Sequence, residues 1–273
     1  MEFDFQAYIR DRKGGGDRRA ASGLGYAFAR DRRVMRTLDM AKPVKLAIDA
    51  STRLGAGRFD AILEASQVAS ANKPEGLLDA VATVCKKLQA TAPDRVHIAA
   101  DDRLGHSTAL AHRGDELLVV TPAMLELTAA QQAFHLGRAL GHLQHGHALY
   151  LGAAWLLADE PASFLRWIVK PASAALESWS RLGDVTADRA GLLATGDLAL
   201  SVAEIMRLSG VVGDGAEVLA EGGMADLDEV LAGRIRALQT FSEAEVFRRS
   251  VGLDGGDSLT SVDSRVEAVI KLV

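Results

Sequence analysis

The chain has 273 residues, of which 48% are hydrophobic and 25% are charged, and its formal net charge is −5. This composition is typical of a globular protein with enough chain to bury a large core. A mildly acidic chain without a long basic run is not suited to coating nucleic acid, so we expect no nucleic-acid partner. The single cysteine, Cys85, excludes an internal disulfide framework and agrees with a reducing compartment.

The sequence predicts no membrane-spanning segment. Residues 1–5 lack the charged-then-apolar pattern of a signal peptide. The longest nearly unbroken apolar run, residues 148–158, is shorter than the roughly 20 residues that a spanning helix needs. We therefore expect a soluble, cytoplasmic protein, and an amphipathic contact with a membrane surface remains open.

Residues 1–40 are predicted to form a partly flexible N-terminal arm, and residues 41–273 to form a single body. The run Gly14-Gly15-Gly16 interrupts any regular element. Arginines lie on both sides of this run, at positions 10, 12, 18, 19, 30, 32, 33 and 36. The arm is interpreted either as a solvated tail or as a docking segment for an acidic partner.

The body is predicted to be mostly helical. Apolar residues recur at helical spacing from Leu77 to Leu88, and a long helix is expected to begin at Thr128. Turn residues and short apolar runs between these two helices predict strands. The expected strands cover residues 96–99, 107–111 and 116–120. The predicted fold class is therefore α+β, with a small, about three-stranded, antiparallel sheet beside helices.

The segment from Phe134 to His147 is expected to place polar residues on one helical face. Leu136, Leu140 and Leu143 form an apolar seam, whereas Arg138, His142 and His145 share a different face. A second segment, residues 183–194, places Asp184 and Asp188 four positions apart, so both point the same way. Taken singly, the first pattern is typical of a solvated face and the second of an acidic pair in the first turn of a helix.

Together the two segments resemble the HtpX and CAAX-prenyl-protease family of zinc metallopeptidases. In that family one helix carries H-E-x-x-H, and a later helix carries E-x-x-A-D-R-x-G. Residues 187–191 match the later motif, while residues 140–142 and His147 match the end of the earlier one. Weaker matches, among them Lys73-Pro74-Glu75 and Arg265, extend the resemblance over about residues 55–273. The resemblance implies a gluzincin, with a zincin-like fold and the sheet next to the motif helix.

The residues that carry the chemistry of the family are altered. Arg138 stands at the first zinc histidine, Ala139 at the catalytic glutamate and Asp184 at the third ligand, while His142 is retained. Arginine offers no lone pair to a metal, and alanine cannot take a proton from water, which removes general-base help worth about 10²–10⁴-fold. We therefore expect no metal, no cofactor and no peptide hydrolysis by the family's mechanism.

The remnant of the site is expected to consist of Arg138, His142, Asp184 and Asp188. Arg138 is long enough to enter the vacated pocket and to form an ion pair with Asp184. Asp188, which orients a ligand histidine in the family, is expected to hold His142 or to pair with Arg138. The chain is thus interpreted as a pseudo-protease that binds, scaffolds or regulates, with a protein or peptide partner held in the old cleft by strand addition.

Two alternatives remain open. A rewired zinc site would use His142, His145 and Asp184, which would make the chain a zinc-dependent peptidase or hydrolase. In the other alternative the chain is a structural subunit of a larger assembly, with the arginine-containing arm as the contact. The other histidines and Cys85 are interpreted as structural residues, and the identity of the partner and the oligomeric state are not evident from the sequence.

Overall fold

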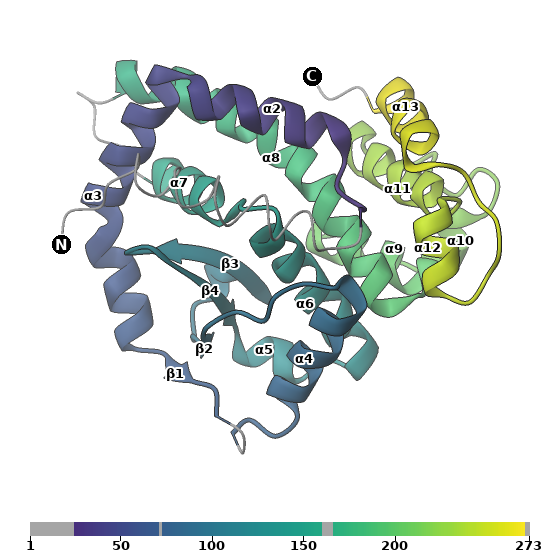
Figure 1. The fold of residues 1–273 in the computed structure, drawn as a ribbon, viewed down its shortest axis with the longest axis horizontal. Helices are drawn as coiled ribbons and strands as arrows, with labels where there is room; N and C mark the ends of the chain where they lie inside the picture. Colours follow the sequence, from purple (N-terminus) through teal and green to yellow (C-terminus); the bar gives the residue numbers. More distant parts are fainter. Residues whose placement is uncertain (1–24, 71–72, 160–165, 271–273) are drawn as a thin grey trace.

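The computed structural model describes residues 25–70, 73–159 and 166–270. Helices dominate these ranges and surround a small sheet (Figure 1). The helices are α2 (Ala29–Met40), α3 (Lys42–Glu64), α4 (Leu77–Leu88), α5 (Pro122–Leu125), α6 (Ala129–Gln144), α7 (Ala148–Asp159), α8 (Arg166–Thr195), α9 (Leu198–Leu208), α10 (Gly215–Leu219), α11 (Glu229–Phe241), α12 (Glu245–Ser250) and α13 (Leu259–Val269). The strands are β1 (Gln67–Val68), β2 (Val96–Ile98), β3 (Ser107–His112) and β4 (Asp115–Val120).

The mixed α and β content agrees with the predicted class, and the three expected strands are present as β2, β3 and β4, but the sheet is neither three-stranded nor wholly antiparallel. The sheet has four strands in the order β1-β2-β4-β3. Strand β2 runs parallel to β4, whereas β1–β2 and β3–β4 are antiparallel. The two residues of β1 are too short a strand to show an alternating pattern. The parallel pair joins strands that are not consecutive, so no turn in the sequence indicates it.

Helix α6 begins where the sequence predicts. Thr128 is its N-cap, and Thr128 and Gln131 form a reciprocal capping box. The helix packs closely against α8 because small residues face each other. A Cβ added at Gly137 would lie 2.8 Å from the carbonyl oxygen of Ala190, and one at Gly191 would lie 3.2 Å from that of Phe134. The backbones of α6 and α8 are therefore close enough for side chains on either helix to meet.

Helix α8 is longer than the sequence indicated. It runs from Arg166 to Thr195, so Asp184 and Asp188 lie well inside it rather than in its first turn. The interpretation of these residues as a first-turn pair stabilised by the helix dipole is therefore wrong, since that effect is confined to the end of a helix.

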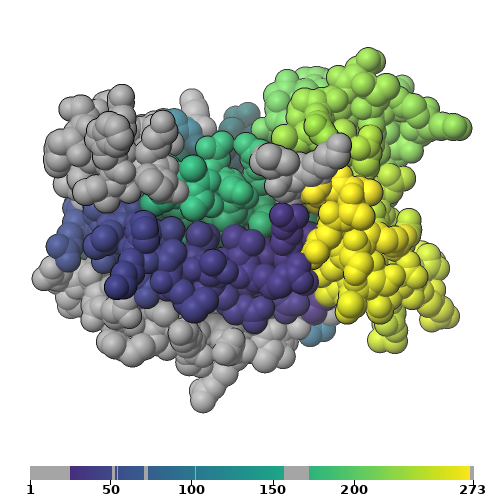
Figure 2. Space-filling model, turned by 90° about the horizontal axis from the view of Figure 1, so that it is seen from above, coloured from purple at the N-terminus to yellow at the C-terminus, as the bar shows by residue number. Residues whose placement is uncertain are grey.

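Part of the predicted N-terminal arm belongs to the body. Tyr26 and Phe28 are fully buried in the main core, and Met35 and Leu38 on α2 join the same cluster. Helix α2 lies along α8 in Figure 1, and Figure 2 shows it beside α13 on the surface. The rest of the predicted arm, residues 1–24, lies outside the described residues.

Two further expectations concern a membrane-spanning helix and the burial of Cys85. Within them, no helix is both long enough and apolar enough to cross a membrane. The apolar run recognised in the sequence forms α7, which has 12 residues. Cys85 is buried in α4, and burial raises the pKa of its thiol.

Candidate functional site

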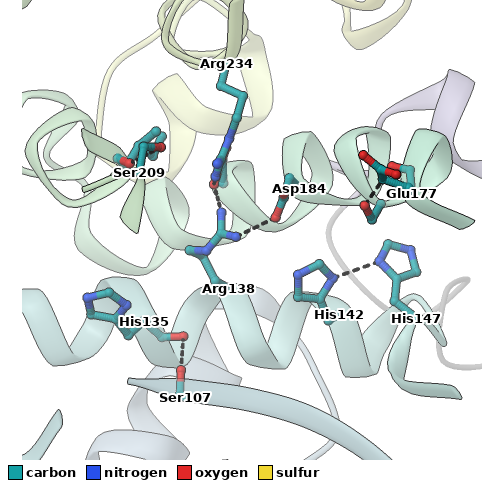
Figure 3. Close-up of polar contacts among 12 residues, drawn as sticks. Ser107, His135, Arg138, His142, His147, Glu177, Asp184, Ser209 and Arg234 are labelled. Carbon is teal, nitrogen blue, oxygen red and sulfur yellow. Dashed lines mark hydrogen bonds and ion pairs between the residues drawn. The ribbon is translucent and has the colours of Figure 1, made fainter. Parts of the chain in front are cut away.

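Arg138 extends from α6 toward two carboxylates on α8 (Figure 3). Its Nη2 donates a hydrogen bond to Oδ1 of Asp184 at 2.7 Å, so the contact expected from the sequence is present. Its Nη1 forms an ion pair with Oδ1 of Asp188. Of the two roles expected for Asp188, the structure therefore has the contact with Arg138.

Arg234 on α11 completes this group of charges. Its Nε and Nη2 donate to the two oxygens of Asp188, each at 3.0 Å. The side chain of Asp188 is 2% exposed, those of Arg138 and Arg234 are each 13% exposed, and that of Asp184 is 32% exposed. We call Arg138, Asp184, Asp188 and Arg234 the charge cluster; it carries two charges of each sign and connects three helices.

The two arginines of the cluster hold Asp184 in its ionised form. Burial by itself would raise the pKa of Asp184, but Arg234 and Arg138 outweigh burial and lower that pKa to about 2. Burial lowers the pKa of Arg138 to about 10, although Asp184 opposes this change. Arg138 is therefore protonated and Asp184 ionised at neutral pH, which is the state that a charge-assisted hydrogen bond requires.

Arg234 is the residue of the cluster that the sequence analysis missed. Arg265, the late arginine noted in the sequence, lies on α13 with 43% of its side chain exposed and pairs with Glu243 and Asp257. The signal for Arg234 is its position among Leu231, Ile235 and Leu238, which are buried on α11. An arginine within the apolar face of a helix needs a buried partner.

His142 belongs to a second polar chain, which leads to helix α2. Its Nδ1 lies 3.0 Å from Nδ1 of His147. Nε2 of His147 lies 3.2 Å from Oδ2 of Asp31 on α2. Asp31 and His147 are both fully buried. We call Asp31, His147 and His142 the histidine chain.

The carboxylate of Asp31 is well supplied with donors. Trp179 Nε1 donates to Oδ1 at 2.9 Å, and Thr186 Oγ1 donates to Oδ2 at 2.6 Å. Burial would raise the pKa of Asp31, but its interactions with His147, Thr186 and Trp179 lower the pKa to about 2. Asp31 is thus an ionised carboxylate held inside the protein by α8 and by His147.

Burial also keeps His142 and His145 neutral. It lowers the pKa of His142 well below its usual value, and it lowers the pKa of His145 to about 3. His145 lies edge-on to Tyr26, with ring centroids 5.0 Å apart, so it belongs to the packing of the N-terminal segment. Both histidines are therefore neutral at pH 7.

The residues present do not fit a zinc ion. The set His142, His145 and Asp184 would be needed for the rewired site. Within the described ranges, however, no group of three or more His, Cys, Asp or Glu side chains is arranged to hold a metal. Arg138, where the resemblance would place the first zinc ligand, offers only a guanidinium, and Ala139, where it would place the catalytic glutamate, is 1% exposed and contributes only a methyl group. No chemical step through a metal follows from this arrangement.

The other histidines take part in local contacts. His135, one turn before Arg138, pairs through Nε2 with Oε2 of Glu204 at 3.0 Å, and Gln131 donates to the same carboxylate at 2.7 Å. This pair joins α6 to α9. His97 contacts Ser66 at 2.7 Å, and His112 contacts Asp60 at 2.8 Å; these contacts tie β2 to the end of α3, and β3 to α3. The ring of His106 packs on that of His135 at 4.5 Å.

Comparison with known proteins leaves the family open. No protein-family model matches the chain, and neither a curated protein nor a solved structure matches it. The resemblance to zinc metallopeptidases therefore rests on the two sequence segments and their order along the chain.

Proposed function

We propose that the protein is a catalytically inactive relative of the HtpX and CAAX-prenyl-protease metallopeptidases and acts by binding a peptide or protein partner at the former active site. The observation that supports the proposal is the contact of Arg138 with both Asp184 and Asp188. In the proposed alignment this guanidinium stands where the first zinc histidine would be, and it engages the carboxylate at the third-ligand position.

Two physical reasons make hydrolysis by the family mechanism unfavourable. A metal ion would have to displace a guanidinium that carries a charge of the same sign and has no lone pair to donate. Losing only a partner of a ligand typically costs about 10–100-fold in metal affinity or activity, and the loss of a ligand costs more. Ala139 also leaves no side chain that can accept a proton from water.

The exposure of Asp184 and the position of β3 at an edge of the sheet support partner binding. Asp184 remains 32% exposed, so an incoming group can reach the charge cluster. Strand β3 is an outer strand in the order β1-β2-β4-β3 and packs against α6, which carries Arg138. Its outer side pairs with no other strand that the structure describes. An extended peptide can add to such an edge without any metal.

The first test is the metal content of the purified chain after dialysis against metal-free buffer, measured by elemental mass spectrometry, together with a peptidase assay with and without a chelator. We expect far less than one metal per chain and no hydrolysis. One tightly held metal per chain, with hydrolysis that the chelator abolishes, would overturn the proposal.

The second test addresses binding. A library of extended peptides is screened, and the amide resonances of the protein are followed by NMR as a selected peptide is added. We expect shifts concentrated on β3, α6 and around Asp184. A matched variant, Asp184→Asn, should change the affinity of peptides that reach the charge cluster. Selected peptides that bind only elsewhere would argue against the former cleft as the binding site.

A further inference from the structure

We propose that the outer surface of α2 and the first turns of α3 binds an anionic phospholipid surface. The inference does not depend on the proposed peptide-binding function, because none of its residues belongs to the charge cluster or to β3. Helix α2 lies along one face of the molecule in Figure 2, and Figure 1 shows its junction with α3 at the periphery. We call six exposed residues of this region the basic surface: Arg32, Arg33, Arg36, Met40, Lys42 and Leu46.

Positive charge is concentrated in this stretch of the chain. Residues 29–46 contain six Arg or Lys and two Asp, although the whole chain has a net charge of −5. One of the two carboxylates, that of Asp31, is fully buried, and the other, that of Asp39, accepts a hydrogen bond from the hydroxyl of Tyr150. The region therefore presents mainly positive charge to the solvent.

The basic side chains of this surface can reach an anionic partner. Arg32 and Arg36 are four positions apart on α2, so they share one face of the helix. Among the residues that the structure describes, Arg32, Arg36 and Lys42 have no ion-pair partner. Arg33 pairs with Glu267 on α13, and its side chain remains 54% exposed. These cations are thus free to exchange water for phosphate and carboxylate groups.

Two large apolar side chains lie beside these charges. Met40 is 74% exposed and Leu46 is 60% exposed. Lys42 comes two residues after Met40 and one helical turn before Leu46, so all three belong to the junction of α2 and α3. Val44 and Ile48 are buried, so the packing of α3 turns Leu46 away from the core. Exposed apolar side chains bordered by basic ones are typical of a surface that lies on a membrane.

A lipid surface accounts for both features of the basic surface. Anionic headgroups attract exposed Lys and Arg, and the boundary beneath the headgroups accepts apolar side chains such as those of Met40 and Leu46. An acidic protein surface would account for the charges alone. Because the contact combines a few charges with two apolar side chains, we expect binding that is reversible and that weakens as the salt concentration rises.

The first experiment measures sedimentation of the full chain with vesicles of phosphatidylcholine, with and without phosphatidylserine. We expect binding only when phosphatidylserine is present. Each basic side chain near the membrane contributes about fivefold to the affinity, so Arg36→Gln combined with Lys42→Gln should lower it about 25-fold. The matched control is Lys86→Gln combined with Arg236→Gln, which removes the same charge from exposed positions on α4 and α11 and should leave the affinity unchanged.

The second experiment tests the apolar contact. Met40→Ser combined with Leu46→Ser should lower the vesicle affinity about tenfold, because less apolar surface leaves the water. Val212→Ser is the control, since Val212 is 94% exposed elsewhere on the molecule. Circular dichroism establishes that each variant is folded.

Three results would overturn the proposal. The first is a folded wild-type chain that does not bind vesicles containing phosphatidylserine, which needs no variant to decide. The second is an equal loss of affinity in the control variants. The third is vesicle binding that the Met40 and Leu46 substitutions leave unchanged and that polyglutamate abolishes, which would assign the basic surface to an acidic protein instead.

Discussion

Arg138 and Asp184 are joined by a hydrogen bond of 2.7 Å between Nη2 and Oδ1, although they lie on different helices and 46 positions apart in the sequence. The contact forms because α6 and α8 cross at small residues, so that one long side chain spans the gap. The same guanidinium also meets Asp188, which in turn holds Arg234. A change at any of these positions therefore affects charges on three helices.

The two carboxylates of the cluster should differ in their effect on stability. Asp188 is nearly buried and holds two guanidiniums, so Asp188→Ala leaves uncompensated charge and should cost about 3–5 kcal/mol of the free energy of unfolding. Asp184 is 32% exposed, and water can replace it, so Asp184→Ala should cost only about 1 kcal/mol or less. Urea denaturation measures both. The surface variant Glu267→Ala serves as a control, and equal losses for Asp184 and Asp188 would contradict this ranking.

The proposed alignment predicts that a zinc site can be restored. The triple variant Arg138→His, Ala139→Glu and Asp184→Glu supplies the ligands and the base of the family in the presence of His142. Asp188 keeps Arg234 as its partner in this variant. We expect close to one zinc per chain by elemental mass spectrometry.

The control for this reconstruction adds His142→Ala, which removes the second ligand and should abolish zinc uptake. Circular dichroism and thermal denaturation establish that both variants are folded. If the folded triple variant takes up no zinc, the positions assigned to the family motif are not correct.

Acid should destabilise the protein before Asp31 and Asp184 bind protons. The pKa of His142 and that of His145 lie below the usual value of 6.5 in the folded chain, so only the unfolded chain binds these protons as the pH falls below that value. Stability is therefore fully present above about pH 6.5 and declines below it, by up to about 1.4 kcal/mol per pH unit for each proton. Asp31 and Asp184, whose pKa values are about 2, add a further loss as the pH falls below about 4.

Denaturant midpoints measured from pH 7.5 to pH 4.5 test this dependence. His142→Gln removes one of the histidines whose pKa burial lowers and should reduce the slope between pH 6.5 and pH 5 relative to the wild type. A stability that is constant across this interval would show that the histidines are not held neutral by burial.

The crossing of α6 and α8 should not tolerate a methyl group. A Cβ at Gly137 would lie 2.7 Å from Cβ of Ala194 and 2.8 Å from the carbonyl oxygen of Ala190. Gly137→Ala should therefore force the helices apart and destabilise the protein by about 1–3 kcal/mol. Gly233 on α11 is the matched control, because a Cβ added there would meet no described atom within 4 Å. Gly233→Ala should stabilise by up to about 1 kcal/mol through helix propensity, and a neutral effect of Gly137→Ala would contradict the close approach.

The local features of the chain were predictable from its residues. The apolar repeat between Leu77 and Leu88 indicates α4, and the capping residues at Thr128 indicate the start of α6. The sequences of β3 and β4 and the turn at Arg113 and Gly114 indicate a hairpin, and both turn residues have positive φ. Each of these features depends on residues only a few positions apart, so all the residues that interact lie in one short stretch of the sequence.

The contact between Arg138 and Asp184 was also predicted from the sequence, because the resemblance to the family motifs assigns both residues to one site. The sequence did not indicate the roles of Arg234 and Asp31 or the parallel pairing of β2 with β4. Asp31 lies more than 100 positions from His147 and sits among arginines that suggest a solvated segment, and Arg234 follows no motif. A charge that is removed from water needs an opposite charge or a hydrogen-bond donor beside it. That partner can come from any part of the chain that packs nearby, so only the tertiary structure decides which residue it is.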